Sequence, residues 1–245
     1  MSYPGAKGQA GTFQRIIGQM PVHSVYVEPF FGSGQVFWRK RRAAVNVIVD
    51  QMPGLLDRAR REAGVIAMAG DALGILPGLA LPADAVIYCD PPYLLETRQG
   101  RLYYEHELSN DQHRRLLALL QALPCRVLLS GYPSELYGAA LQSWRCLSYR
   151  ARTRGKTVTE CLWCNFPEPV ELADWRFAGR NFRERLSLKR LAARWLARIE
   201  GMPARKRGYV LHAIAQRQSR QGPRPAPDLA FRSATPVPAL APGTP

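Results

Sequence analysis

The sequence predicts an α/β fold, a doubly wound and mostly parallel sheet with helices on both faces. Short apolar runs of strand type alternate with helical segments over the first 170 residues, as in such sheets. Each run ends in a polar or glycine-bearing turn, and ligands bind at that end of a parallel strand. The 245 residues, 47% of them hydrophobic, are enough for one ordinary domain and an appendage.

The first half of the chain contains four expected strands. They are the apolar runs at residues 24–28, 45–50, 65–68 and 85–89. The first is followed by a glycine loop and an expected helix over residues 35–44. The second is followed by an expected helix whose apolar residues Leu55, Leu56 and Ala59 fall near helical spacing.

The second half continues the alternation. Ser109 and Gln112 have the spacing of a capping box, and leucines follow at helical intervals, so a helix is expected over residues 110–123. An apolar strand, a short helix and a last strand are then expected at residues 125–130, 133–141 and 157–166.

Residues 181–199 predict a basic amphipathic helix. Its apolar stripe and its arginine stripe consist, respectively, of Leu188, Leu191, Trp195 and Ile199, and of Arg183, Arg190, Arg194 and Arg198. We expect the apolar stripe to dock on the body and the arginines to point outward. The sequence thus divides into a principal domain (1–170), a basic helical extension (171–220) and a tail (221–245) whose seven prolines favour disorder.

The net charge of +15 is concentrated in that extension. Residues 176–220 hold 13 Lys and Arg against 2 acids, whereas residues 1–175 hold 19 against 16. A basic segment attached to a nearly neutral body predicts a polyanionic partner.

The five cysteines form no even framework, and there is neither a signal peptide nor an apolar run of about 18 residues. These features favour a reducing cytoplasm and no membrane association. Cys161 and Cys164 have CxxC spacing, but no second pair accompanies them, and the alternation around them favours a strand over a zinc or redox site. No metal is expected.

Asp90-Pro91-Pro92-Tyr93 follows the expected strand at residues 85–89. The Asp90 carboxylate can accept one N–H of an aromatic amine. The Pro91 carbonyl can accept the other, since a Pro-Pro step is held extended and cannot turn inward to pair. Tyr93 can stack on the ring that carries the amine. A strand followed by an ordinary Pro-Pro turn is the alternative.

A glycine loop follows the first expected strand, and Gly32 and Gly34 let its backbone approach a ligand closely. Asp50 ends the second strand, where dinucleotide folds place the acid that binds ribose hydroxyls. No third glycine completes the phosphate-binding fingerprint, which favours a ligand without a pyrophosphate, such as S-adenosylmethionine. Asp50 as a simple turn acid or helix cap is the alternative.

Three motifs resemble those of the Dam-type N6-adenine DNA methyltransferases, and they follow one another in the same order along the chain. They are Tyr3-Pro4-Gly5-Ala6-Lys7-Gly8, the loop at 28–34, and Asp90-Pro91-Pro92-Tyr93. The resemblance covers about residues 1–170 and implies a Rossmann-like, S-adenosylmethionine-dependent methyltransferase. It implies catalytic roles for Asp90, Pro91, Pro92 and Tyr93. It implies cofactor contacts for Tyr3, Lys7, Glu28, Phe30, Gly32, Gly34, Asp50, Asp71 and Asp90.

One departure from the family bears on DNA recognition. Only 18 residues separate Asp71 from Asp90, too few for the target-recognition insert of sequence-specific members. The expected partner is double-stranded DNA, contacted through Arg98, Arg101, Tyr103, Arg152, Arg154, Lys156, Arg190 and Arg194. The resemblance therefore predicts a monomeric enzyme with relaxed sequence preference, similar to compact phage or prophage members.

Three alternatives stay open at this point. The same amine chemistry serves cytosine N4 in DNA, and a basic extension also suits a structured RNA that carries the target adenine. A catalytically inactive DNA-binding relative could keep the fold. Cofactor binding separates that relative from the enzymes.

Overall fold

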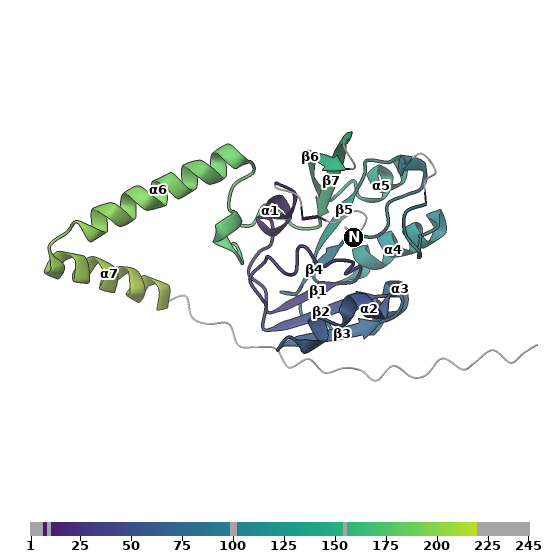
Figure 1. The fold of residues 1–245 in the computed structure, drawn as a ribbon, viewed down its shortest axis with the longest axis horizontal. Coiled ribbons are helices and arrows are strands. Elements are labelled where there is room, and N and C mark those ends of the chain that lie inside the picture. The colour runs from purple at the N-terminus through teal and green to yellow at the C-terminus, as the bar shows by residue number, and fades with distance from the viewer. Residues whose placement is uncertain (1–6, 9–10, 99–101, 154–155, 220–245) are drawn as a thin grey trace, which may run out of the picture.

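The computed structural model describes residues 7–8, 11–98, 102–153 and 156–219. One seven-stranded sheet, in the order β3-β2-β1-β4-β5-β7-β6, forms its centre (Figure 1). The strands are β1 (Val25–Glu28), β2 (Val45–Asp50), β3 (Val65–Ala69), β4 (Val86–Cys89), β5 (Arg126–Gly131), β6 (Arg145–Thr153) and β7 (Lys156–Cys164).

Helices precede, connect and follow these strands. The α-helices are α1 (Thr12–Ile17), α2 (Pro53–Leu56), α3 (Ala72–Ile75), α4 (Asn110–Ala122), α5 (Glu135–Ala140), α6 (Phe182–Glu200) and α7 (Ala204–Ser219). Short 3₁₀ turns are η1 (Ala59–Arg61), η2 (Leu76–Gly78), η3 (Glu96–Arg98) and η4 (Trp175–Phe177). The α4 cap is the expected one: the Ser109 Oγ accepts the Gln112 N–H, and the Gln112 side chain accepts the Ser109 N–H.

The strand pairing confirms the predicted fold class. β3, β2, β1, β4 and β5 are all parallel, and β7 then pairs antiparallel with both β5 and β6. The strand order turns back between β1 and β4, which are direct neighbours although two strands intervene in sequence. In such a sheet this switch point is where a ligand crevice opens.

Each face of the sheet is covered by its own hydrophobic layer. Val25, Val27 and Ile87 contribute to one layer, which α3, α4 and α5 cover with residues such as Leu116 and Tyr137. Tyr26, Val86 and Tyr88 contribute to the other layer, which Ile16 of α1 and Leu56 of α2 cover. The central strands are thus buried on both sides, which explains why they read as continuous apolar runs.

All six predicted strands occur, and the sheet has a seventh strand, β6, that was not predicted. In β6, Leu147, Tyr149 and Ala151 face the core, while Cys146, Ser148 and Arg150 are exposed. Because β6 is an edge strand with one wet face, its sequence mixes arginines with apolar residues and lacks the signature of a buried strand.

The helix predicted over residues 35–44 is not present. Isolated turns stand there, with hydrogen bonds such as Trp38 N–H to Gly34 O at 2.9 Å. The backbone beyond them bonds to a different segment: Arg41 N–H donates to Asp174 Oδ2 at 3.1 Å, and Arg176 Nη2 donates to Arg39 O at 3.1 Å. These tertiary bonds hold residues 39–41 in a non-helical path.

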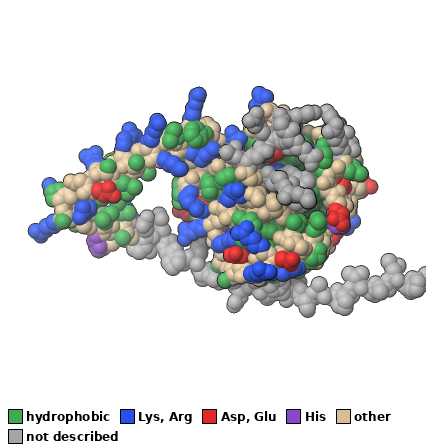
Figure 2. All heavy atoms as spheres, viewed as in Figure 1, with side chains coloured by type: hydrophobic (Ala, Val, Ile, Leu, Met, Phe, Trp, Pro, Cys, Tyr) green, Lys and Arg blue, Asp and Glu red, His purple; other side chains and the backbone are tan. Residues whose placement is uncertain are grey.

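The predicted basic helix forms as α6, but its apolar stripe does not dock on the body. No α6 residue is buried, and Leu188, Leu191 and Trp195 are 42%, 42% and 54% exposed. Figure 1 shows α6 and α7 projecting from the body as an arm, which we define as residues 182–219. Lys and Arg side chains line both helices of the arm (Figure 2). The predicted tail at 221–245 lies outside the described residues.

The segment between β7 and the arm is attached to the body through Asp174, whose side chain is nearly fully buried. Asp174 Oδ2 accepts Arg41 N–H and Arg176 Nη2 at 3.1 and 2.6 Å, and Oδ1 accepts the Arg176 backbone N–H and Nε. Burial opposes the charge, but these donors outweigh it and lower the pKa of Asp174. The Phe177 ring packs edge-on against Phe13 at 5.7 Å between centroids.

Replacing this carboxylate should loosen the junction. In Asp174→Asn an N–H₂ group replaces one of the two accepting oxygens. At least one N–H donor then loses its acceptor, and we expect the free energy of unfolding to fall by about 1–3 kcal/mol. Urea denaturation at pH 7 measures it. Because the pKa of Asp174 is lowered on folding, its contribution is present at neutral pH and is lost as the pH falls through that pKa.

The control is Asp57→Asn, which changes an exposed aspartate paired with Arg60 at 2.8 Å. An exposed pair of this kind contributes at most about 1 kcal/mol. Equal losses in the two variants, or a loss at Asp174 that does not shrink in acid, would contradict this account of the junction.

None of the helices in the described part of the chain is long and apolar enough to cross a membrane.

Candidate functional site

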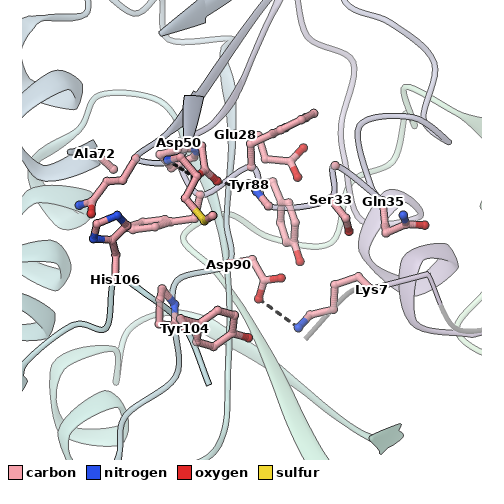
Figure 3. Close-up of a pocket in the computed structure, with 18 of the residues that line it drawn as sticks. Lys7, Glu28, Ser33, Gln35, Asp50, Ala72, Tyr88, Asp90, Tyr104 and His106 are labelled. Carbon is pink, nitrogen blue, oxygen red and sulfur yellow. Dashed lines mark hydrogen bonds and ion pairs between the residues drawn. The ribbon is translucent and has the colours of Figure 1, made fainter. Parts of the chain in front are cut away.

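The carboxyl ends of β1, β2 and β4 open onto one cavity of about 310 Å³. The glycine loop after β1, residues of the segment after β4 and residues 103–106 all line it. Figure 3 shows side chains from these separate segments pointing into the same space, among them Glu28, Asp50, Asp90 and Lys7. Parallel pairing brings them together, because it aligns the ends of neighbouring strands.

The glycine loop depends on backbone angles that favour glycine. Gly32 and Gly34 have φ values of 51° and 62°. A Cβ on Gly34 would lie 2.4 Å from the Phe31 ring and 2.8 Å from Trp38 Nε1. The loop therefore packs its glycine against aromatic rings and leaves its own backbone, with Phe30, on the cavity side.

Asp50 holds the loop in place. Its Oδ2 accepts the Gly32 N–H at 2.7 Å, and its Oδ1 accepts the Met52 N–H at 2.9 Å. A carboxylate oxygen can accept two hydrogen bonds, so each keeps capacity for a ligand hydroxyl. Asp50 can therefore stabilise the turn and still bind a ligand, so the two interpretations of this residue are compatible.

Asp71 serves as a helix cap. Its Oδ1 accepts the Leu73 N–H at 3.1 Å at the start of α3, and its neighbours Gly70 and Ala72 line the cavity. A contact between Asp71 and a cofactor adenine stays a prediction.

Glu28 is a buried acid at the end of β1. Tyr26 OH donates to its Oε2 at 2.7 Å, and burial raises the pKa of Glu28 to about 8. Lys40, also buried, has its pKa lowered by burial to about 7, and its ammonium lies 3.8 Å from the centre of the Tyr26 ring. Glu28 lines the cavity, so this carboxyl group with its raised pKa is presented to a ligand there.

Asp90 and Lys7 form the ionic centre of the site. Lys7 Nζ lies 3.0 Å from Asp90 Oδ1, and the two side chains point toward one another in Figure 3. Burial alone would lower the pKa of Lys7, but the Asp90 and Glu160 carboxylates outweigh it and raise that pKa. Lys7 was expected to contact the cofactor, and the structure gives it a direct contact with the predicted amine acceptor. Pro92 lines the cavity, while Pro91 is buried beside it.

Tyr93 is packed beneath this ion pair. Its hydroxyl accepts a hydrogen bond from Lys7 Nζ at 2.6 Å, the same ammonium lies 4.7 Å from its ring centroid, and Tyr132 meets the ring edge-on at 4.6 Å. Only 9% of Tyr93 is exposed, and burial raises the pKa of its hydroxyl well above the ordinary value. Stacking of a base on Tyr93 thus requires Lys7 to move from the ring.

Arg98, which was expected to contact DNA, is buried and paired with an acid of the protein. It is 8% exposed, and its Nη1 and Nη2 donate to the two Glu107 carboxylate oxygens at 3.0 and 2.5 Å. Glu107 Oε1 also accepts the backbone N–H groups of Tyr103 and Tyr104 at 2.8 and 3.0 Å. This corrects the expectation of a phosphate-facing guanidinium: Arg98 fixes the loop that holds Tyr103 and Tyr104 at the cavity.

The other residues expected to contact DNA are dispersed. Arg152 and Lys156 lie on the β6–β7 hairpin, opposite Thr157 and Thr153, and Arg190 and Arg194 are exposed on α6. Tyr3, Arg101 and Arg154 lie outside the described residues.

Glu160, which was not predicted as a site residue, is a buried acid on β7 whose Oε2 lies 3.8 Å from Lys7 Nζ. Val158, Leu162 and Cys164 share its side of the strand and belong to the core, so an acid stands at a position of apolar parity. That departure from the alternation is the signal that could have revealed it.

The strand interpretation of the CxxC segment is confirmed. Cys161 and Cys164 are buried on β7, and they belong to the hydrophobic layers on opposite faces of the sheet. Alternation in a strand thus separates the two thiols. Among the described residues, no group of three or more His, Cys, Asp or Glu is arranged to hold a metal ion.

The fold is that of the class I S-adenosylmethionine-dependent methyltransferases, as the mixed seven-stranded sheet in the order 3-2-1-4-5-7-6 shows. No protein-family model matches the sequence, and no curated protein matches it. A more specific family therefore rests on the motifs.

Similar solved structures have low sequence identity. The 23S rRNA methyltransferase ErmE is 11% identical, with a TM-score of 0.45 over 68% of this chain and 70% of that one. TrmK of M. capricolum, determined with S-adenosylhomocysteine, is 5% identical, with a TM-score of 0.44 over 87% and 97%. A dimethyladenosine transferase from Plasmodium falciparum is 12% identical, with a TM-score of 0.41 over 64% and 62%.

The glycine loop offers a direct test of the site's geometry. Gly34→Ala should lower the free energy of unfolding by about 1–3 kcal/mol, because a Cβ at φ 62° is strained and meets Phe31 and Trp38. Chemical denaturation measures this loss. The control Gly54→Ala adds a Cβ with nothing within 4 Å, and should be neutral or stabilising by up to about 1 kcal/mol. A Gly34→Ala protein as stable as the wild type would refute the packing described.

Proposed function

We propose that this chain transfers a methyl group from S-adenosylmethionine to the N6 amine of adenine in double-stranded DNA. The observation that carries the proposal is Asp90-Pro91-Pro92-Tyr93 at the carboxyl end of β4, where Asp90 and Pro92 line the same cavity as the glycine loop. The reaction needs acceptors for two amine hydrogens and a surface for a ring. Asp90, Pro91 and Tyr93 are suited to these tasks.

The residues around the cavity fit S-adenosylmethionine. The exposed glycine-loop backbone and the buried Glu28 suit its charged amino-acid part, and Asp50 has acceptor capacity for ribose hydroxyls. Neither strand end contributes a phosphate-binding glycine fingerprint, in keeping with a ligand that has no pyrophosphate. When bound, this cofactor supplies a methyl group already activated as a sulfonium.

The protein's part in the reaction is to position the amine. The Asp90 carboxylate accepts one N6–H and the Pro91 carbonyl accepts the other, which draws the nitrogen toward tetrahedral geometry and directs its lone pair away from the ring. Tyr93 supports the base by stacking. Catalysis of this kind rests on orientation and electrostatics and needs no strong base.

Adenine N6 is not reachable inside a stacked duplex, so the target nucleotide must rotate out of the helix into the cavity. The basic arm suits the phosphate contacts that hold the duplex while this happens. Its arginines Arg183, Arg190, Arg194 and Arg198 share one side of α6, and α6 carries only two acids. Phosphate contacts carry little sequence information, which supports relaxed specificity.

Removal of the Asp90 carboxylate tests the chemistry. Asp90→Ala should abolish methyl transfer while the protein stays folded, because the amine loses its charged acceptor. Transfer of labelled methyl groups to unmethylated genomic DNA measures activity, and circular dichroism reports folding. The control Asp111→Ala changes an aspartate that is 88% exposed and should keep full activity. A folded Asp90→Ala protein with full activity would sink the assignment.

The same assay identifies the substrate. Nucleoside analysis after labelling of DNA and RNA distinguishes N6-methyladenine from N4-methylcytosine, and DNA from RNA. Methylation confined to one short motif would overturn the relaxed specificity. A chain that does not bind S-adenosylmethionine in calorimetry would be an inactive relative.

The arm makes a separate prediction about salt dependence. Loss of Arg190 and Arg194 by substitution with Gln should weaken DNA binding and reduce the slope of log K against log salt by about 2, or about 1 per lost phosphate contact. Titrations by fluorescence anisotropy at several salt concentrations measure the slope. The control is the double variant Arg60→Gln, Arg61→Gln. It removes the same amount of charge from exposed positions on the body and should leave the slope near the wild-type value. Equal slopes in the two double variants would refute a role for the arm.

A further inference from the structure

Lys7 contacts both of the side chains that the proposed reaction requires. Its ammonium lies 3.0 Å from Asp90 Oδ1 and donates to the Tyr93 hydroxyl at 2.6 Å. An amine that enters the site needs the Asp90 carboxylate as an acceptor, and its ring needs the face of Tyr93. The same ammonium lies over the Tyr93 ring, 4.7 Å from its centroid, so Lys7 must move off that ring before a base can stack there.

A buried ammonium cannot leave one carboxylate without a second partner. Lys7 is 6% exposed, and a charge of this kind is costly to bury unpaired. Glu160 Oε2 lies 3.8 Å from Lys7 Nζ, slightly farther than Asp90 and within ion-pairing distance. The site thus holds one cation between two acids.

Glu160 is held firmly on the sheet. It stands on β7 opposite Tyr149 of β6, and Tyr149 OH donates to its Oε2 at 3.2 Å. Glu160 is 6% exposed, and burial raises the pKa of its carboxyl group although the Lys7 ammonium opposes that rise. Because the hairpin fixes this acid, its charge stays in place when groups at the end of β4 change partners.

We propose that Glu160 is a positioning residue that takes over the Lys7 ammonium when the substrate amine binds to Asp90. The inference rests on the proposed function. In the state described, Lys7 bridges Asp90, Tyr93 and Glu160. On substrate entry the ammonium shifts toward Glu160, which uncovers the Tyr93 ring and releases Asp90 Oδ1 beside the oxygen that accepts the amine N–H. The carboxylates and the ammonium exchange contacts, and no proton changes place.

Loss of the Glu160 charge should appear as weaker substrate binding. In Glu160→Gln the Lys7 ammonium keeps its contact with Asp90 but loses the carboxylate toward which it would shift. The state in which the amine can bind is then less populated, and the apparent affinity for the substrate falls in proportion to that population. We expect KM for unmethylated genomic DNA to rise about tenfold while kcat changes by less than about twofold. Glu160→Asp keeps the charge and should recover most of the loss.

Two controls separate this role from a structural one. Glu171→Gln removes the charge of an exposed acid in the segment that follows β7, and its KM and kcat should match those of the wild type. In a Lys7→Met background, Glu160→Gln should change KM by less than about twofold, since the effect passes through the ammonium. Calorimetry with S-adenosylmethionine should give the same affinity for Glu160→Gln as for the wild type.

The outcomes are distinguishable. A wild-type chain that transfers no methyl group to nucleic acid refutes the proposed function and this inference with it. An active wild type with unchanged KM in Glu160→Gln refutes the inference alone. So does a KM increase that persists undiminished in the Lys7→Met background, because Glu160 would then act independently of Lys7.

Discussion

The parallel placement of β1 between β2 and β4 is the constraint on which the site depends. It aligns the carboxyl ends of three strands that are far apart in sequence, so that Glu28, Asp50 and Asp90 surround one cavity. Both faces of these strands are buried, which makes their ends rigid points of attachment. Two hydrogen bonds to β2 then hold the glycine loop, from Gly32 N–H to Asp50 Oδ2 and from Phe31 N–H to Val49 O.

Electrostatics divides the molecule into two parts with different tasks. At the cavity the buried Lys7 ammonium lies between Asp90 and Glu160, and the low-dielectric surroundings strengthen both attractions. The arm instead carries exposed arginines, whose charges act over a longer range and are screened by salt. Under the proposed function, local pairing suits the orientation of the amine, and the dispersed charge suits contacts with several phosphates of the DNA.

The sequence predicted elements well where local pattern and tertiary environment agree. The parallel strands and α4 follow from apolar runs and from the capping box of Ser109 and Gln112. Prediction was wrong where distant residues decide the backbone: bonds from residues 174 and 176 hold residues 39–41 out of a helix. It also failed for the apolar stripe of α6, because periodicity shows which residues share a face but not whether another element covers it.

The sequence by itself determined the fold class, the glycine loop and the Asp90-Pro91-Pro92-Tyr93 motif, since apolar patterning, glycine and proline act through local sterics. Only the tertiary structure decided which charges meet. It placed Lys7 on Asp90, brought Glu160 from a strand far along the chain, and paired Arg98 with Glu107. Ion pairs between distant segments leave no periodic trace in a sequence, because they form only when the sheet has set the distances between its strand ends.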